Sequence, residues 1–173
     1  MRPIVVEGPD GAGKSTLLDQ LAKDLDREAR HTGGSNKTVA ELDEKCREQA
    51  FWMRNGIILD RCTFISDPIY KDALGQRPLR STVILAARLW TLDPIIVYCR
   101  RASIDDMLNG ILDVKKDHKP AEYLAQVRES YPRIVRGYDY VTEYLRDQGF
   151  TVLPYDWQVD SYHHLLEQIK CAA

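Results

Sequence analysis

The segment that most constrains this chain is a glycine-rich loop between a short apolar run and a helical pattern. Residues 8–15 read GPDGAGKS and fit the pattern G-x-x-x-x-G-K-S/T. The loop follows the β-branched run at residues 4–6 and precedes leucines spaced three and four residues apart, so it joins a buried strand to an amphipathic helix. In that setting the pattern predicts a phosphate-binding loop (P-loop), whose backbone N–H groups surround a chain of phosphates.

Each residue type in this loop has a physical role in binding a nucleoside triphosphate. Glycines let the backbone come close to the phosphates, and the helix N-terminus adds positive potential. Lys14 brings a full positive charge to the β- and γ-phosphates, and Ser15 offers its hydroxyl group to Mg²⁺. The sequence therefore predicts ATP and Mg²⁺ as cofactors. The predicted donor residues of the loop are Gly8, Gly11, Ala12, Gly13, Lys14, Ser15 and Thr16.

The rest of the chain alternates short apolar runs with helical patterns. The apolar runs, which predict further strands, are residues 57–59, 95–99 and 151–153. A further, weakly signalled strand is expected near residues 30–32. The helical patterns cover about 14–30, 39–54, 85–92, 103–108, 121–147 and 161–171. Pro132 is expected to kink or divide the longest of these helices.

Apolar strands that do not alternate with polar residues, and that are separated by helices, predict a parallel sheet covered on both faces. We therefore expect an α/β fold of the three-layer P-loop NTPase class, with a mostly parallel five-stranded sheet and a short lid segment. The 173 residues contain no linker and no internal repeat, which favours a single domain over residues 1–173.

Composition and charge exclude several other classes of protein. With 44% hydrophobic and 29% charged residues, the chain has the make-up of an ordinary globular domain. A formal net charge of −2 disfavours stable binding of nucleic acid. The four cysteines include no C-x-x-C pair, which is typical of free thiols in a reducing compartment. The N-terminal apolar run is too short for a signal peptide or a membrane span, so we expect a cytoplasmic protein without a membrane partner.

A second candidate site follows the strand at residues 57–59. Asp60 ends this strand, where an aspartate of a P-loop protein approaches the metal, so Ser15 and Asp60 are the predicted metal ligands. Arg61 comes next, and an Asp-Arg pair at the carboxyl end of a strand lies where open α/β sheets bind ligands. A switch GTPase is disfavoured, because a guanine-reading N-K-x-D and a D-x-x-G after this strand are both missing.

Three motifs, in the correct order, resemble those of thymidylate kinases. Residues 7–16 read EGPDGAGKST, similar to the family's E-G-x-D-G-x-G-K-S/T-T, in which the aspartate is distinctive. Residues 30–35 (RHTGGS) resemble its R-E-P-G-G-T, with His31 and Thr32 in place of glutamate and proline. Residues 60 and 61, followed by Ser66 and Tyr70, resemble its D-R-Y/H, serine and A-Y. The likeness covers about the first 70 residues and is greatest to the compact, phage-type members.

The resemblance implies a role for each matched residue. Asp10 would meet the 3′-hydroxyl of an acceptor nucleotide and help to organise its phosphate, and Arg61 would bind that phosphate. Gly33 and Gly34 would bring the backbone close to the acceptor, and Tyr70 would pack by the sugar and disfavour a ribose 2′-hydroxyl. The implied catalytic residues are Lys14, Asp10 and Arg61, and the implied acceptor residues are Asp10, Gly33, Gly34, Asp60, Arg61, Ser66 and Tyr70. The candidates for the aromatic residue and arginine that contact the base in the family are Arg47, Phe51, Trp52 and Arg54.

Phosphoryl transfer also needs cationic side chains and a lid that excludes water. Residues 109–120 are polar and contain Lys115, Lys116 and Lys119, so they are the predicted lid, with an ordinary solvated loop as the alternative. Arg100 and Arg101 follow the strand at 95–99, where either could reach a phosphate or stack on adenine. The alternative for both is an ordinary surface arginine.

Together these features predict an enzyme that transfers the γ-phosphoryl group of ATP to a deoxynucleoside monophosphate, with a thymidylate-like acceptor favoured. The alternatives are a P-loop kinase for a hydroxymethylated pyrimidine nucleotide or base, and a nucleotide-binding ATPase without an acceptor. The resemblance also implies a homodimer, and the host cytoplasm as its location if a phage encodes it. The base remains open, because one methyl group distinguishes thymine from uracil and is worth only about 1–3 kcal/mol.

Overall fold

The computed structural model of the chain describes residues 2–32, 36–115 and 120–173, without the side chains of Thr82 and of residues 113–115. Its centre is a five-stranded sheet in which every strand runs parallel to its neighbours. The strands are β1 (Ile4–Glu7), β2 (Ala29–His31), β3 (Ile58–Asp60), β4 (Ile95–Cys99) and β5 (Val152–Tyr155), in the order β2-β3-β1-β4-β5. This confirms the expected α/β fold and its parallel sheet.

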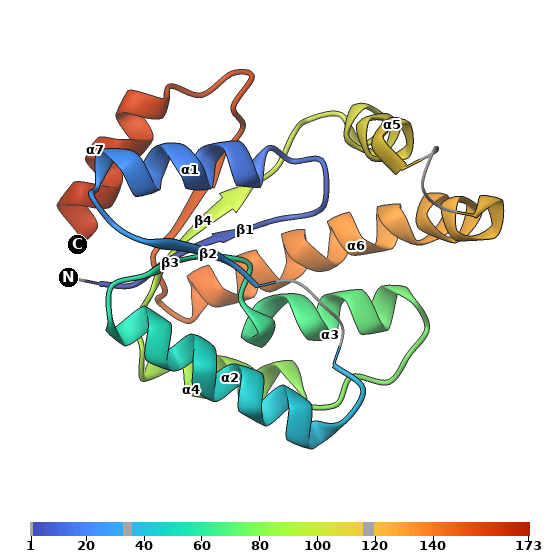
Figure 1. Cartoon of the computed structure of the whole chain (residues 1–173), viewed down its shortest axis with the longest axis horizontal. Helices are drawn as coiled ribbons and strands as arrows, with labels where there is room; N and C mark the ends of the chain where they lie inside the picture. Colours follow the sequence, from blue (N-terminus) through green and yellow to red (C-terminus); the bar gives the residue numbers. More distant parts are fainter. Residues whose placement is uncertain (1, 33–35, 116–119) are drawn as a thin grey trace.

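Helices cover both faces of the sheet, with α1 and α7 on one face and α2, α3 and α4 on the other (Figure 1). The helices of the described ranges are α1 (Lys14–Asp24), α2 (Val39–Arg54), α3 (Thr63–Ala73), α4 (Thr82–Trp90), α5 (Ile104–Lys115), α6 (Ala121–Asp147) and α7 (Tyr162–Ala172). None of them is long and apolar enough to cross a membrane.

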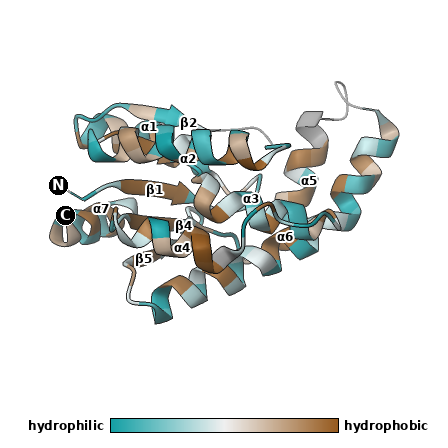
Figure 2. Cartoon of the chain, turned by 90° about the horizontal axis from the view of Figure 1, so that it is seen from below, coloured by the Kyte–Doolittle hydropathy of each residue, from teal (hydrophilic) through white to brown (hydrophobic). Residues whose placement is uncertain are grey.

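Alternate residues of the central strand face opposite layers, although all of them are apolar. Ile4 and Val6 pack in one core with leucines of α1 and α7, whereas Val5 packs in the other core with residues of α2, α3 and α4. All three side chains are fully buried. Figure 2 shows β1 in the hydrophobic colour. A strand buried on both faces needs no polar residues, which explains why its sequence does not alternate.

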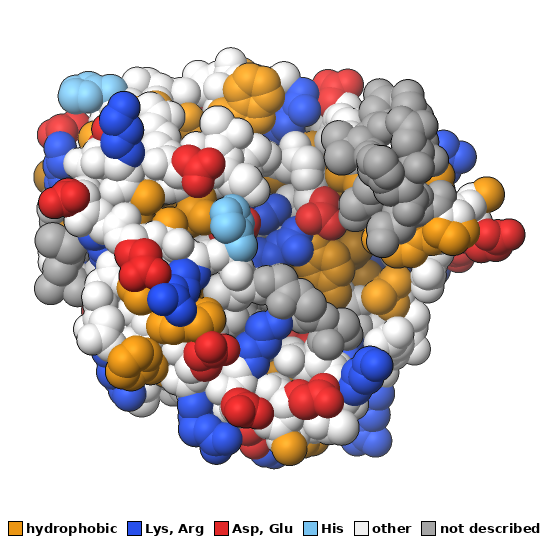
Figure 3. All heavy atoms as spheres, in the orientation of Figure 1, with side chains coloured by type: hydrophobic (Ala, Val, Ile, Leu, Met, Phe, Trp, Pro, Cys, Tyr) orange, Lys and Arg blue, Asp and Glu red, His pale blue; other side chains and the backbone are white. Residues whose placement is uncertain are grey.

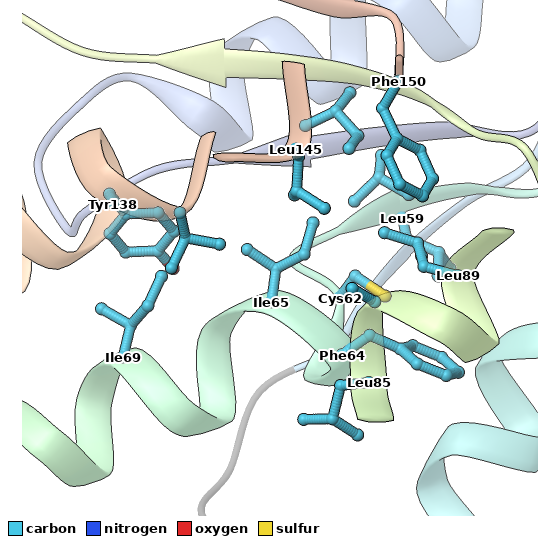
Figure 4. Packing of buried hydrophobic residues seen from close by; sticks show 14 of the residues in the cluster. Leu59, Cys62, Phe64, Ile65, Ile69, Leu85, Leu89, Tyr138, Leu145 and Phe150 are labelled. Carbon is cyan, nitrogen blue, oxygen red and sulfur yellow. The ribbon is translucent and has the colours of Figure 1, made fainter. Parts of the chain in front are cut away.

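The second core fixes α3 against its neighbours (Figure 4). Ile65 and Ile69 of α3 point toward Tyr138 and Leu145 of α6, and all four belong to this core. This packing holds one face of α3 in place, so the residues on its remaining surface are presented in a fixed position near the carboxyl end of β3.

Most helix boundaries agree with the sequence pattern. α2 spans the predicted residues 39–54, because Thr38 and Glu41 form a capping box at its start. The hydroxyl of Ser161 likewise accepts a hydrogen bond at the start of α7. The first helix is shorter than predicted and ends at Asp24, because Asp26 adopts a left-handed conformation (φ 50°) and the chain then enters β2.

The predicted lid differs most from expectation. α5 does not stop near residue 108 but continues to Lys115, so the first part of segment 109–120 is helix rather than loop. Leu108 and Ile111 are buried in the core that includes Ala12, and this burial outweighs the cost of Gly110 inside a helix. α6 is also a single helix that is not divided at Pro132. Figures 1 and 2 show its first turns running at an angle to the remainder.

Candidate active site

The P-loop lies between β1 and α1, where glycines permit very close packing. Gly8 has a φ of 141° and Gly11 a φ of 78°, both in the range that favours glycine. A Cβ atom at Gly8 would lie 2.1 Å from the carbonyl oxygen of Cys99, and one at Gly11 would lie 2.6 Å from that of Met107. The loop is therefore pressed between β4 and α5, and a larger residue at either position would displace backbone.

The N-terminus of α1 is available to an anion. Gly13 caps the helix without a side-chain hydrogen bond, and the first turn contains no acidic residue. Ser15 and Thr16 are exposed on that turn. The first N–H groups and the positive end of the helix dipole are therefore not used by a side-chain cap, which is the arrangement of a phosphate site.

Lys14 lies beside this loop with its charge largely removed from water. The residue is 6% exposed, and its Nζ donates a hydrogen bond to the carbonyl oxygen of Pro9 at 2.6 Å. Burial lowers the pKa of Lys14, and the charge of Arg61 lowers it further, while Asp10 and Asp60 oppose the shift. Lys14 and Arg61 are therefore two positive charges that repel one another in a largely buried region, and an anion bound between them would relieve this repulsion.

Asp60 ends β3 and is held by one neighbour. Its Oδ2 pairs with Nδ1 of His31 at 2.7 Å, and its side chain is 12% exposed. Its Oδ1 is buried and has no hydrogen-bond partner among the described residues. A buried carboxylate oxygen without a partner is costly, so this position suits a cation or a bound donor.

Ser15 and Asp60 fit the predicted magnesium site in chemistry. A hydroxyl and a carboxylate are the hard oxygen ligands that Mg²⁺ prefers, and Asp60 Oδ1 is free to serve as one. Within the described ranges no group of three or more His, Cys, Asp or Glu residues could hold a metal alone. A magnesium ion here would therefore take most of its ligands from the phosphates of a nucleotide and from water.

Arg61 occupies a strained position at the centre of the site. Its φ of 69° is left-handed, which is uncommon for a residue with a side chain and is found mostly where function requires it. The guanidinium group donates hydrogen bonds to the carboxylate of Asp10 and, at 2.9 Å, to the hydroxyl of Tyr70. It also lies 5.1 Å from the centre of the Tyr70 ring. The structure therefore brings Asp10, Arg61 and Tyr70 into contact.

Glu7 lies beneath this cluster and was not among the predicted site residues. It is fully buried, and its Oε1 accepts a hydrogen bond from the backbone N–H of Cys62. Burial raises the pKa of Glu7 to about 7, although the hydrogen bond from Cys62 and the charges of Arg61 and Lys14 oppose the rise. A carboxylate that ends an apolar strand just before Gly8 is the sequence signal that could have identified it.

A cavity of about 320 Å³ opens beside Arg61, and we call it the α3 cavity. Figure 3 shows the face concerned, where basic, acidic and apolar side chains meet near the centre. Of the predicted acceptor residues, Arg61, Ser66 and Tyr70 line the cavity. Its other lining residues are Thr32, Asn36, Thr63, Asp67, Lys71, Leu74, Gln76 and Tyr123. The P-loop and the α3 cavity thus adjoin at Arg61.

Trp157 covers the other side of the P-loop and was also not predicted. A Cβ atom at Gly13 would lie 2.7 Å from Cδ1 of its ring. The guanidinium group of Arg101 lies 5.4 Å from the centre of the same ring. Arg100 instead pairs with Asp139 of α6 at 2.9 Å. Both arginines line a second cavity of about 390 Å³, but only Arg101 contacts a residue that covers the loop.

The remaining predicted residues do not join the described site. Gly33, Gly34, Lys116 and Lys119 lie outside the described residues, as does the side chain of Lys115. The four base candidates of α2 do not line the α3 cavity. Arg47 and Arg54 line a separate groove between α2 and α4, Phe51 is 64% exposed, and Trp52 lies under Arg30.

Comparison with protein-family models and with curated proteins found no match. Solved structures do align with nearly the whole chain. A YorR protein from Bacillus subtilis, in complex with phosphorylated GDP, aligns with a TM-score of 0.69 at 18% identity, over 98% of this chain and 94% of that one. The chain has the fold of the P-loop kinases.

Two kinases of known activity share this fold. Deoxyadenosine kinase from M. mycoides, with the products dCMP and dCDP bound, aligns with a TM-score of 0.64 at 18% identity, over 99% of this chain and 98% of that one. Shikimate kinase from Acinetobacter baumannii, in complex with shikimate, aligns with a TM-score of 0.56 at 17% identity, over 99% and 93% of the two chains. At these identities the acceptor has to be argued from the residues of this chain.

Proposed function

We propose that this protein transfers the γ-phosphoryl group of ATP to the 5′-phosphate of a deoxynucleoside monophosphate, which gives ADP and a deoxynucleoside diphosphate. The observation that carries the proposal is the position of Arg61. Its guanidinium group touches Asp10 of the P-loop and Tyr70 of α3, and it also lines the α3 cavity. A single cation therefore stands between a site for a triphosphate and a second cavity suited to a phosphate-bearing acceptor.

The donor half of the reaction uses the P-loop. The open N-terminus of α1 and the amine of Lys14 would hold the β- and γ-phosphates. Ser15 and Asp60 would hold Mg²⁺, which when bound supplies charge neutralisation on the phosphate oxygens. His31 would hold Asp60 through the hydrogen bond to Oδ2, which leaves Oδ1 without a partner among the described residues. Trp157 and Arg101 offer flat and cationic surface beside the loop, where an adenine ring could stack.

The transfer step requires positioning rather than a strong base. The bond between the γ-phosphorus and the bridging oxygen of ADP breaks while an oxygen of the acceptor phosphate bonds to that phosphorus. The acceptor phosphate is already ionised, so no proton needs to be removed. Arg61 would bind this phosphate, and its Nε, which is buried and has no hydrogen-bond partner among the described residues, provides a donor for it.

The sugar of the acceptor would lie by Tyr70. The ring of Tyr70 is held edge-on by Tyr138 at 6.2 Å between centroids, and its hydroxyl is held by Arg61. A ring fixed on two sides leaves little room for an added 2′-hydroxyl, which supports a deoxyribose acceptor. The deoxyadenosine kinase structures hold dATP, dCTP, or dCMP with dCDP, so related folds accommodate deoxynucleotides in those proteins.

The thymidylate-like acceptor is supported by motifs whose residues would contact the phosphate and the sugar. None of the described residues in those motifs is assigned to the base, so the motifs support the class of acceptor more strongly than thymine itself.

The same resemblance supports a homodimer, and a sedimentation measurement would test it by finding twice the mass of the 19.9 kDa chain. A single cooperative unfolding transition would support one domain over residues 1–173.

A coupled ADP-release assay with Mg²⁺–ATP tests the proposed function. The acceptors are a panel of deoxynucleoside monophosphates, a hydroxymethylated pyrimidine nucleotide, shikimate and no acceptor. We expect ADP release that depends on an added deoxynucleoside monophosphate and that is lost in Lys14→Ala but kept in Lys23→Ala, which changes an exposed lysine at the far end of α1. Equal ADP release without any acceptor would instead indicate an ATPase, and activity confined to another acceptor would identify a different kinase.

A further inference from the structure

A buried polar cluster forms part of the wall of the α3 cavity. Its members, Asn36, Asp67 and Lys71, are 5%, 8% and 7% exposed, and all three line the cavity. The side-chain amide of Asn36 donates to Oδ1 of Asp67 at 2.9 Å, and Nζ of Lys71 donates to the carbonyl oxygen of Asn36 at 2.7 Å. Asp67 and Lys71 are four residues apart on α3, so they share one face of the helix.

One atom of this cluster lacks a partner. Oδ2 of Asp67 is buried, and it accepts no hydrogen bond from any described residue. Leaving a buried carboxylate oxygen unpaired costs more than leaving a neutral group unpaired, so such atoms usually have a use. The other carboxylate oxygen is already fixed by Asn36, so Oδ2 also has a defined direction. Asp67 therefore brings to the wall of the α3 cavity a carboxylate with one unpaired oxygen, beside the Lys71 amine, and a donor that reached Oδ2 would satisfy it.

The cluster lies where the base of an acceptor nucleotide would lie, an argument that rests on the proposed function. Arg61 marks the phosphate end of the cavity, and Tyr70 marks the sugar. The hydroxyl of Tyr70 bonds to Arg61 at 2.9 Å, so this side chain reaches the phosphate end of the cavity, whereas Asp67 and Lys71 are tied to Asn36 on the wall of the same cavity. A nucleotide that begins at Arg61 and runs along α3 would bring the edge of its base to this cluster.

We infer that the acceptor base carries an amino group, as cytosine, adenine and guanine do, and that Asp67 selects it over thymine and uracil. An amino group donates N–H to a carboxylate, which is how aspartate and glutamate recognise cytosine in DNA. Thymine and uracil present a carbonyl oxygen at the same position, so two acceptors would face one another without a hydrogen. This inference departs from the thymine expected from the motifs, because it depends on Asp67 rather than on the residues near the phosphate.

Matched pairs of acceptors that differ in one amino group provide the test. The pairs are dCMP with dUMP, 5-methyl-dCMP with dTMP, dAMP with dIMP, and dGMP with dIMP, each measured as kcat/KM with saturating Mg²⁺–ATP. For the best base, we expect the amino member to exceed its partner by at least about tenfold, since a site built to bind a donor rejects an analogue without it. Binding of the same monophosphates, followed by thermal shift, should show the same order without turnover.

Asp67→Asn is the sharpest variant. Its Oδ1 can keep the bond from Asn36 and place an amide N–H₂ where Oδ2 now lies, which turns the acceptor into a donor. The ratio of kcat/KM for dCMP over dUMP should then fall at least about tenfold and move toward dUMP. Asp72→Asn, an exposed carboxylate on the same helix, is the control and should leave the ratio unchanged.

The outcomes separate this inference from the proposed function. Transfer to monophosphates with dTMP or dUMP preferred by the wild type would overturn the role of Asp67 and leave the kinase proposal standing. The role of Asp67 would also be overturned, with the kinase proposal left standing, if Asp67→Asn changed the ratio of kcat/KM for deoxy over ribo acceptors but not the ratio for dCMP over dUMP. If no monophosphate is phosphorylated or bound, both proposals fail. Should Asp67→Asn fold poorly, the wild-type pairs still decide the matter.

Discussion

Replacing Glu7 with glutamine tests the electrostatics at the floor of the site. Glu7 is fully buried, and burial raises its pKa from the ordinary 4.5 to about 7. Each pKa unit corresponds to about 1.4 kcal/mol, so a rise from 4.5 to about 7 means that ionised Glu7 costs the folded state about 3 kcal/mol. Glutamine keeps the oxygen that accepts the Cys62 N–H and removes the titrating proton.

The direction in which stability changes with pH follows from whether the folded or the unfolded chain keeps the proton of Glu7. Below pH 4.5 Glu7 is protonated in both the folded and the unfolded chain, and its contribution to stability is fully present. Between pH 4.5 and about 7 the unfolded chain has released the proton while the folded chain retains it, so stability falls as pH rises. Above about 7 the loss is complete. The unfolding free energy of Glu7→Gln minus that of the wild type should therefore increase by about 3 kcal/mol across this window.

The assay is urea unfolding, followed by circular dichroism, at pH values from below the lower pKa to above the higher one. Taking the difference between variant and wild type cancels the titration of all other groups. Glu44→Gln, an exposed carboxylate on α2, serves as the control and should give a difference that does not change with pH. A pH-independent difference for Glu7→Gln as well would show that Glu7 has an ordinary pKa, and the reasoning from burial would be wrong.

Three further changes test separate parts of the site. Lys14→Ala should lower turnover by about 10²–10³, as expected for loss of one preorganised charge, and a near wild-type rate would remove its assigned role. Tyr70→Ala should narrow the preference for deoxy over ribo acceptors, so an unchanged ratio of kcat/KM would exclude the tyrosine as the sugar-selecting group. Gly8→Ala should reduce the free energy of unfolding by ~3 kcal/mol or more, because its Cβ would lie 2.1 Å from the carbonyl oxygen of Cys99. Gly110→Ala is its control, since nothing lies within 4 Å there and alanine favours the helix; a comparable loss in both variants would contradict the packing argument.

The sequence was sufficient for features that depend on local pattern. The central strands β1, β3 and β4 were predictable because a parallel sheet buries both of their faces and each contains an apolar run, whereas the edge strand β2 (Ala29–His31) is largely exposed and carries only a weak signal. The bounds of α2 were predictable because Thr38 and Glu41 form the capping box in sequence as well as in space. The extension of α5 was missed because Gly110 and the lysines at 115–119 favour a loop, although Leu108, Ile111 and Leu112 continue a helical spacing. Burial of Ile111 against the P-loop is the tertiary contact that this spacing serves.

The candidate site likewise contains residues that sequence motifs could identify and residues that only the folded structure reveals. Asp10, Arg61 and Tyr70 could be selected as candidates because their motifs occur in a recognisable order, and the structure shows that the three side chains are in contact. Trp157 follows β5, far from the P-loop in sequence, and no pattern indicates that it covers Gly13. Asp67 could not be identified from the sequence for a different reason. It looks like an ordinary polar residue of a helix, and only the packing of α3 shows that one of its oxygens is buried without a partner.

Transfer of label from γ-labelled ATP to an added deoxynucleoside monophosphate tests the central proposal most directly, with the product identified by mass. If Arg61 joins a donor site to an acceptor site, label will appear in a deoxynucleoside diphosphate in proportion to the ADP formed. If the label appears only in inorganic phosphate, whichever monophosphate is supplied, the α3 cavity is not an acceptor site and the proposed function is wrong.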